Sequence, residues 1–145
     1  MCLIKFGDSI EKDLGPRKFV HLYISALFAS DYMAQKLDNK GRGADCLGAS
    51  GALSALQSYA CLSNPGMKIQ VFGRFKLRAP WACLIWFLSE LRMVGEETGI
   101  SHGAHVGGFL FGVLFFLVND VCDYGRGVEK WKLPYSVRIK VQRRY

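Results

Sequence analysis

Two long stretches without charged side chains set the strongest limit on how this chain can fold. Residues 46–67 and 100–119 contain no Asp, Glu, Lys or Arg over 22 and 20 residues. About 20 consecutive apolar residues in a helix can cross the ~30 Å hydrocarbon core of a bilayer. Half of the 145 residues are hydrophobic, and the mean hydropathy is +0.13. A membrane protein is therefore favoured over a soluble domain.

Two weaker apolar stretches complete the predicted arrangement. Asp31 interrupts the first, and Glu90 and Arg92 interrupt the second, so these charges must face protein, water or the lipid headgroups. The membrane domain is predicted to occupy residues 1–122, and residues 123–145 form a basic C-terminal tail. We predict an all-α fold, a polytopic membrane bundle of about four helices, with spans at residues 18–35, 46–66, 79–94 and 100–119.

Basic residues divide unevenly between the two sides of such a bundle. If four spans alternate, 15 of the 19 Lys and Arg residues lie on the side that holds both termini. The positive-inside rule produces such a bias, so both termini are expected to face the cytosol or an equivalent compartment. The net charge of +7 predicts anionic lipid beside the basic face. Nucleic acid is not expected as a partner, because the basic residues follow no binding motif.

A serine and a histidine lie near the starts of the two uncharged stretches. Ser50 belongs to the segment Gly48-Ala49-Ser50-Gly51, and His105 lies at a similar predicted depth. Imidazole can accept the proton of a serine hydroxyl and so make it a nucleophile. We predict Ser50 as nucleophile, His105 as general base, and the backbone at Gly48, Ala49 and Ser50 as the oxyanion-binding segment. Taken alone, the serine segment is also typical of closely packed membrane helices.

Glycines beside both motifs predict a close helix contact. Gly108 and Gly112 follow His105 by three and seven residues and form a G-x-x-x-G pattern. Such a groove suits a partner helix with small residues, and Gly51 would begin one. The alternative is simple helix dimerisation, with His105 as a polar contact.

Metals and cofactors are not expected. His102 is predicted to lie at the membrane interface. A site made from His102, His105 and a cysteine would lack a carboxylate or a CxxC pair at ligand spacing. The five cysteines are odd in number and are interpreted as buried free thiols.

Together the two motifs resemble the rhomboid intramembrane serine proteases. In that family a G-x-S-G serine opens the fourth core helix, and a histidine followed at +3 and +7 by glycines opens the sixth. Gly48-Ala49-Ser50-Gly51 and His105, Gly108 and Gly112 match this pattern. The segments 47–53 and 102–112, with a basic tail that contains Trp131 and Pro134, look most like the mitochondrial presenilin-associated rhomboid-like branch.

The resemblance implies a function in the membrane. A Ser50–His105 dyad would cleave transmembrane segments of membrane-protein substrates, and the location would be the mitochondrial inner membrane. Residues 79–94 would be the fifth core helix, whose movement helps to admit substrate. One departure is Ser54, where bacterial members carry an aromatic residue that stacks on the histidine, so the imidazole must be oriented by another group.

A second departure concerns the start of the chain. The first two core helices of the family, with the H-x-x-x-N motif that helps to bind the oxyanion, should precede Met1. We therefore expect an N-terminally truncated rhomboid sequence that is inactive or nearly so on its own. The alternative is a catalytically inactive rhomboid-like protein that binds transmembrane helices.

Overall fold

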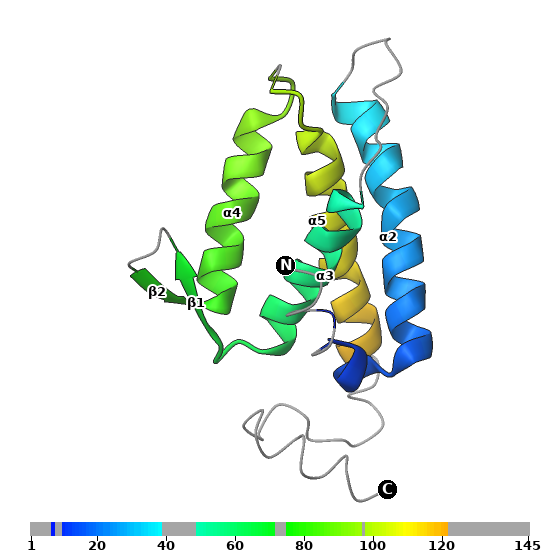
Figure 1. Cartoon of the computed structure of the whole chain (residues 1–145), viewed down its shortest axis with the longest axis vertical. Coiled ribbons are helices and arrows are strands. Elements are labelled where there is room, and N and C mark those ends of the chain that lie inside the picture. The colour runs from blue at the N-terminus through cyan, green and yellow to red at the C-terminus, as the bar shows by residue number, and fades with distance from the viewer. Residues whose placement is uncertain (1–6, 8–9, 39–48, 72–74, 97, 122–145) are drawn as a thin grey trace, which may run out of the picture.

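The described helices run alternately up and down one bundle (Figure 1). The computed structural model describes residues 7, 10–38, 49–71, 75–96 and 98–121. Pro16 and Pro80 lie in the first turns of two helices, where a missing N–H costs no hydrogen bond. The elements in order are α2 (Pro16–Leu37), α3 (Ser50–Ser63), β1 (Lys68–Val71), β2 (Phe75–Arg78), α4 (Ala79–Met93), α5 (His102–Phe116) and the π-helical turn η1 (Leu117–Val121).

A short hairpin between α3 and α4 departs from the predicted all-α fold. β1 and β2 pair antiparallel, with Ile69 opposite Leu77 and Lys68 opposite Arg78. Polar and apolar residues alternate along both strands, so that Ile69 and Leu77 are half-buried while Lys68 and Arg78 are exposed. Alternation with period two indicates a strand with one buried face. The fold is therefore mostly helical with one small sheet.

α3 lies at the centre of the bundle and consists mainly of small residues. It packs against both α2 and α5. The main core joins it to α2 through Leu22 and Ala26 and to α5 through Phe116. On α3 itself the buried apolar side chains of this core are Ala52, Ala55, Leu56, Tyr59 and Ala60.

Glycines allow α3 and α5 to touch backbone to backbone. A Cβ atom on Gly108 would collide with the carbonyl oxygen of Gly51, and one on Gly112 would collide with the carbonyl oxygen of Ala55. Ser58, whose Oγ also lies against Gly112, donates to the carbonyl oxygen of Phe109 at 3.0 Å. The three glycines singled out from the sequence thus lie in one seam between the two helices.

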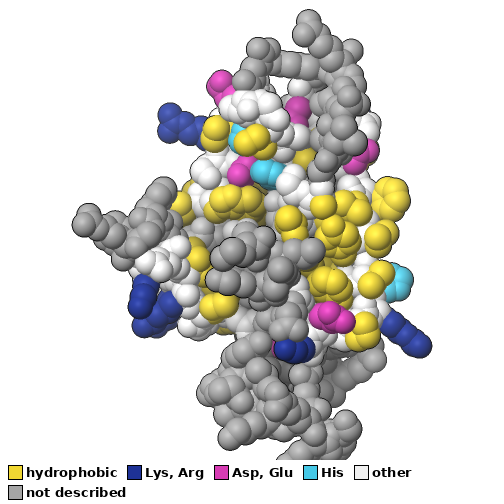
Figure 2. Space-filling view, viewed as in Figure 1, with side chains coloured by type: hydrophobic (Ala, Val, Ile, Leu, Met, Phe, Trp, Pro, Cys, Tyr) yellow, Lys and Arg dark blue, Asp and Glu magenta, His cyan; other side chains and the backbone are white. Residues whose placement is uncertain are grey.

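The described helices expose many apolar side chains, but their lengths do not establish how many of them cross a membrane. Within the described residues, His102–Asn119 is the one stretch of helix long and apolar enough to cross a membrane. α3 and α4 contain 14 and 15 residues, or about 21 and 23 Å of helix. On the face drawn in Figure 2, hydrophobic side chains gather in the middle and most charged ones lie toward the two ends. The four-span count stays a prediction, and residues 123–145 of the predicted tail lie outside the described residues.

Candidate active site

Ser50 occupies the first helical position of α3. Ala49 precedes it as the cap residue, and both residues are exposed. Gly48 lies outside the described residues. The first N–H groups of a helix have no acceptor within the helix, so the N–H of Ser50 is available to an incoming oxygen. The carbonyl oxygen of Ser50 accepts a hydrogen bond from Ser54 Oγ at 3.0 Å.

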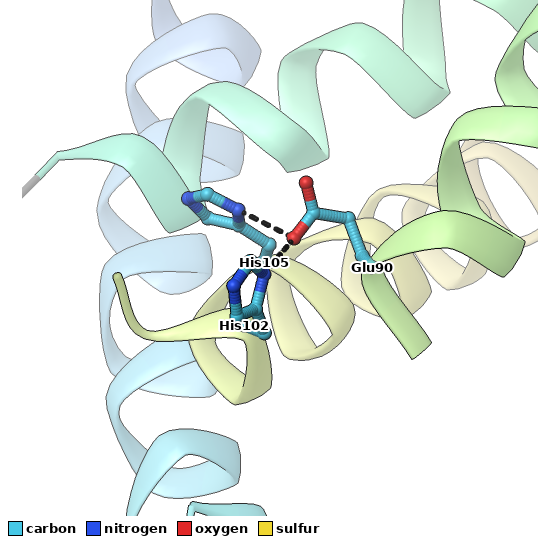
Figure 3. Close-up of side chains that lie close together, drawn as sticks. All are labelled: Glu90, His102 and His105. Carbon is cyan, nitrogen blue, oxygen red and sulfur yellow. Dashed lines mark hydrogen bonds and ion pairs between the residues drawn. The ribbon is translucent and has the colours of Figure 1, made fainter. Parts of the chain in front are cut away.

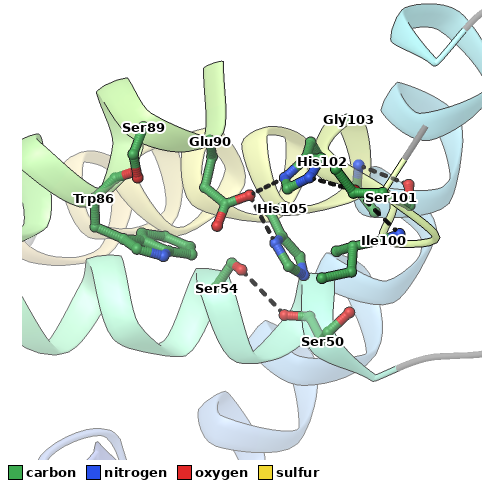
Figure 4. Close-up of polar contacts among 12 residues, drawn as sticks. Ser50, Ser54, Trp86, Ser89, Glu90, Ile100, Ser101, His102, Gly103 and His105 are labelled. Carbon is green, nitrogen blue, oxygen red and sulfur yellow. Dashed lines mark hydrogen bonds and ion pairs between the residues drawn. The ribbon is translucent and has the colours of Figure 1, made fainter. Parts of the chain in front are cut away.

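His105 is brought toward Ser50 by the glycine seam. A Cβ atom on Gly51 would lie 3.0 Å from the carbonyl oxygen of Ala104, and these two residues adjoin Ser50 and His105 in the sequence. The ring of His105 extends from α5 toward Ser50 (Figure 4). Within the described residues no hydrogen bond joins Ser50 Oγ to the imidazole. The serine and the histidine therefore share one end of the α3–α5 contact.

A carboxylate from α4 holds the opposite edge of the His105 ring. Glu90 Oε2 lies 2.9 Å from His105 Nδ1 and 2.7 Å from His102 Nδ1 (Figure 3). The side chains of Glu90 and His105 are only 13% and 15% exposed. An ionised carboxylate can only accept hydrogen bonds, so each Nδ1 carries the hydrogen. In a neutral imidazole this leaves the Nε2 of His105 with its lone pair, ready to accept a proton.

His102 is buried within the protein. It retains 4% of its surface, and its Nε2 lies 2.8 Å from Thr98 Oγ1. In a neutral ring whose Nδ1 donates to Glu90, Nε2 accepts the hydrogen of the Thr98 hydroxyl. Both ring nitrogens of His102 are therefore satisfied. The predicted interfacial position of His102 concerns depth along α5 and stays a prediction, whereas the contact with Glu90 of α4 was not predicted.

An aromatic ring also contacts His105, but it comes from α4. The centroids of the Trp86 and His105 rings are 6.1 Å apart, and the planes are tilted by 36°. Ser54, at the position where bacterial rhomboids carry an aromatic residue, bonds back to its own helix. Trp86 and Glu90, one turn apart on α4, supply the orienting contacts that α3 does not.

The start of α5 is fixed by the end of α2. Ser101 Oγ donates to one oxygen of Asp38 at 2.6 Å, and the N–H of Gly103 donates to the other at 3.0 Å. Ser101 Oγ also accepts the N–H of Ala104 at 3.2 Å. A carboxylate is favoured at a helix N-terminus because unpaired N–H groups give that end a partial positive charge. These bonds set the position of the turn that carries His102 and His105.

Sequence reasoning missed Glu90, Thr98 and Asp38 as parts of this site. Glu90 was noted as a charge that interrupts an apolar stretch. An ionisable residue within such a stretch is by itself a signal of function. Its partners could not be read from spacing, because Glu90 lies on α4 and the histidines lie on α5.

Comparison with known proteins supports the resemblance drawn from the two motifs. A model of the rhomboid domain matches residues 1–119. No curated protein and no solved structure matches the chain. The matched region extends past the end of α5 and so includes all the residues of the candidate site. The chain therefore belongs to the rhomboid family of intramembrane serine proteases and is an integral membrane protein.

Proposed function

We propose that this chain acts as a serine endopeptidase within the membrane, with Ser50 as nucleophile and His105 as general base. The observation that carries the proposal is the hydrogen bond from His105 Nδ1 to Glu90 at 2.9 Å. It fixes the tautomer whose free Nε2 lone pair lies on the side of the ring toward Ser50 (Figure 4). A base oriented by a third group is the arrangement that activates serine nucleophiles on many unrelated folds.

The proposed reaction follows from these positions. Ser50 Oγ attacks the carbonyl carbon of the scissile peptide, and its proton passes to His105 Nε2. The Ser50 N–H, with the backbone at Gly48 and Ala49, donates to the oxyanion that forms. Glu90 stabilises the imidazolium, because it accepts from Nδ1. The imidazolium then protonates the leaving amine, and water hydrolyses the acyl-enzyme with His105 again acting as base.

The substrates of such a site are transmembrane segments of other membrane proteins. An extended segment must reach Ser50, which is exposed at the end of the molecule where α3 and α5 begin. We place the chain in the membrane with four spans, with its basic end beside anionic lipid. The resemblance to the presenilin-associated branch supports a location in the mitochondrial inner membrane.

A second candidate function has one observation in its favour. Ser50 Oγ makes no hydrogen bond to His105 within the described residues. An unengaged serine is compatible with a rhomboid-like protein that binds transmembrane helices without cleaving them. The two functions make opposite statements about the reactivity of Ser50.

A fluorophosphonate probe separates them, because it forms a covalent bond with an activated serine. The purified full chain in lipid nanodiscs should be labelled, and Ser50→Ala and His105→Ala should both abolish labelling. Ser89→Ala serves as the matched control, since Ser89 is an exposed serine of α4. It should label as the wild type does. Equal absence of labelling in all four proteins would refute the protease and favour the binding module.

A further inference from the structure

Three side chains that can bind a metal come together at the site. The sequence did not reveal this group, because the carboxylate lies on a different helix from the two histidines. Glu90, His102 and His105 each direct a ligand atom to one point, and these atoms lie within 4.8 Å of one another. His102 and His105 lie three residues apart on one face of α5, and Glu90 faces them from α4 (Figure 3). All three side chains are largely buried: His102 is 5% exposed, His105 15% and Glu90 13%. Two imidazoles and one carboxylate form a donor set that zinc uses in proteins, with a fourth position left open.

We propose that Glu90, His102 and His105 bind a zinc ion that inhibits the protease. The ion would be held by the Nδ1 atoms of the two histidines and by the Glu90 carboxylate. Bonds of about 2.0–2.1 Å in a tetrahedron separate the ligand atoms by about 3.3 Å. The present N–O separations of 2.7 and 2.9 Å are those of hydrogen bonds, and the three ligand atoms are spread over as much as 4.8 Å. Zinc entry therefore requires Glu90 to withdraw by roughly half an ångström and the two imidazoles to close on the ion.

The surroundings of the three side chains fit a zinc site. The Glu90 carboxylate offsets part of the charge of the ion. Thr98 Oγ1 lies 2.8 Å from His102 Nε2, and an outer partner of this kind usually orients a histidine ligand. Nitrogen donors favour zinc over calcium or magnesium, which prefer oxygen.

Inhibition follows from the tautomer of His105, and this step depends on the proposed function. At present Nδ1 carries the hydrogen, because it donates to Glu90. Zinc on Nδ1 takes the lone pair of that atom, so the neutral ring must carry its hydrogen on Nε2 instead. Nε2 then has no lone pair for the proton of Ser50. His102 undergoes the same change, and its Nε2–H would donate to Thr98 Oγ1.

Cobalt and zinc binding to the full chain in nanodiscs test the site directly. Co²⁺ in a tetrahedral nitrogen and oxygen site gives intense visible absorption, and added Zn²⁺ should remove it by competition. His102→Ala and Glu90→Gln should each weaken binding by at least about tenfold. His21→Ala is the matched control, because the chain has three histidines and His21 is exposed on α2. It should bind as the wild type does, and circular dichroism verifies that each variant is folded.

Two results would overturn the zinc site: no metal-dependent spectrum in the wild type, or equal binding by wild type, Glu90→Gln and His102→Ala. A thiolate charge-transfer band that persists in both variants would assign the ion to cysteines and would also overturn it. Inhibition is tested by fluorophosphonate labelling, which Zn²⁺ should suppress in the wild type and in His21→Ala. Metal binding without any labelling would refute the protease and leave the site standing. Labelling that saturating Zn²⁺ does not reduce would refute inhibition.

Discussion

At the scale of single residues, Glu90 links the chemistry of the site to the packing of the bundle. One of its oxygens accepts a hydrogen bond from two different imidazoles. A hydrogen bond to a charged group contributes about 1.5–3 kcal/mol. The carboxylate thus fixes the tautomer of His105 and ties α4 to α5 with the same atom.

Replacement of Glu90 separates its orienting role from its charge. Glu90→Ala should lower fluorophosphonate labelling of Ser50 by about 10²-fold or more, because the His105 tautomer is no longer fixed. Glu90→Gln should recover part of this loss, since an amide oxygen can still accept from Nδ1. Glu96→Ala is the control, because Glu96 is exposed. If Glu90→Ala and Glu96→Ala label at the same rate, Glu90 does not position the base.

The candidate residues of the dyad were predicted from the sequence, whereas the groups that orient them were not. Ser50 and His105 each lie in a local motif, and the two motifs taken together match the rhomboid pattern. Glu90, Trp86 and Asp38 act through contacts between helices, and neither propensity nor periodicity specifies which helix faces which. The missing aromatic residue at Ser54 did indicate that the imidazole needed another partner.

At the scale of elements, the glycine seam determines how closely α3 and α5 approach. Gly108 meets the backbone of Gly51, and Gly112 meets Ala55 and Ser58. The G-x-x-x-G pattern predicted a close contact of this kind. Larger side chains would push the helices apart and would move His105 away from the start of α3.

A single methyl group in the seam should therefore destabilise the bundle. Gly112→Ala should lower the free energy of unfolding by about 1–3 kcal/mol, because the added carbon must displace packed backbone. Thermal unfolding in detergent measures the effect. Gly66→Ala provides the comparison, since no atom lies within 4 Å of a Cβ built there. Equal melting temperatures for the two variants would show that the seam is less tight than described.

The ends of a helix are harder to predict from the sequence than its presence. The predicted span at residues 46–66 corresponds to a helix of 14 residues, from Ser50 to Ser63. The cap residue Asn64 follows it, and then come Pro65 and Gly66, which both disfavour continued helix. The hairpin was missed because its strands contain four residues each, too few to stand out beside long apolar stretches.

At the scale of the whole molecule, the described basic residues gather at one end. The end where α2 and α4 begin carries six of them, and the end where α3 and α5 begin carries two (Figure 1). The six are Lys12, Arg17, Lys18, Lys68, Lys76 and Arg78, and the two are Lys36 and Arg92. This distribution agrees with the basic and the less basic side of the bundle that the sequence predicts from the positive-inside rule.

Site-directed labelling tests whether α3 and α4 cross the membrane. Single cysteines at Lys36, Lys76 and Arg92, in a chain whose own cysteines are replaced, are exposed to a membrane-impermeant maleimide in sealed vesicles. Lys36→Cys and Arg92→Cys should react from one side and Lys76→Cys from the other, because the predicted span at 46–66 separates Lys36 from Lys76 and Arg92 lies near the far end of the span at 79–94. Reaction of all three from a single side would rule out the four-span arrangement.

The attachment of α4 differs along its length. Its buried side chains, Ala79, Ala82 and Cys83, all belong to its first five residues. From residue 88 to residue 93, only Glu90 is not exposed. An outward movement of the far half of α4 that makes way for a polypeptide must therefore break the hydrogen bonds between Glu90 and both imidazoles. In the proposed protease, His105 would then lack its orienting carboxylate, and cleavage would wait until α4 closes again around the bound chain.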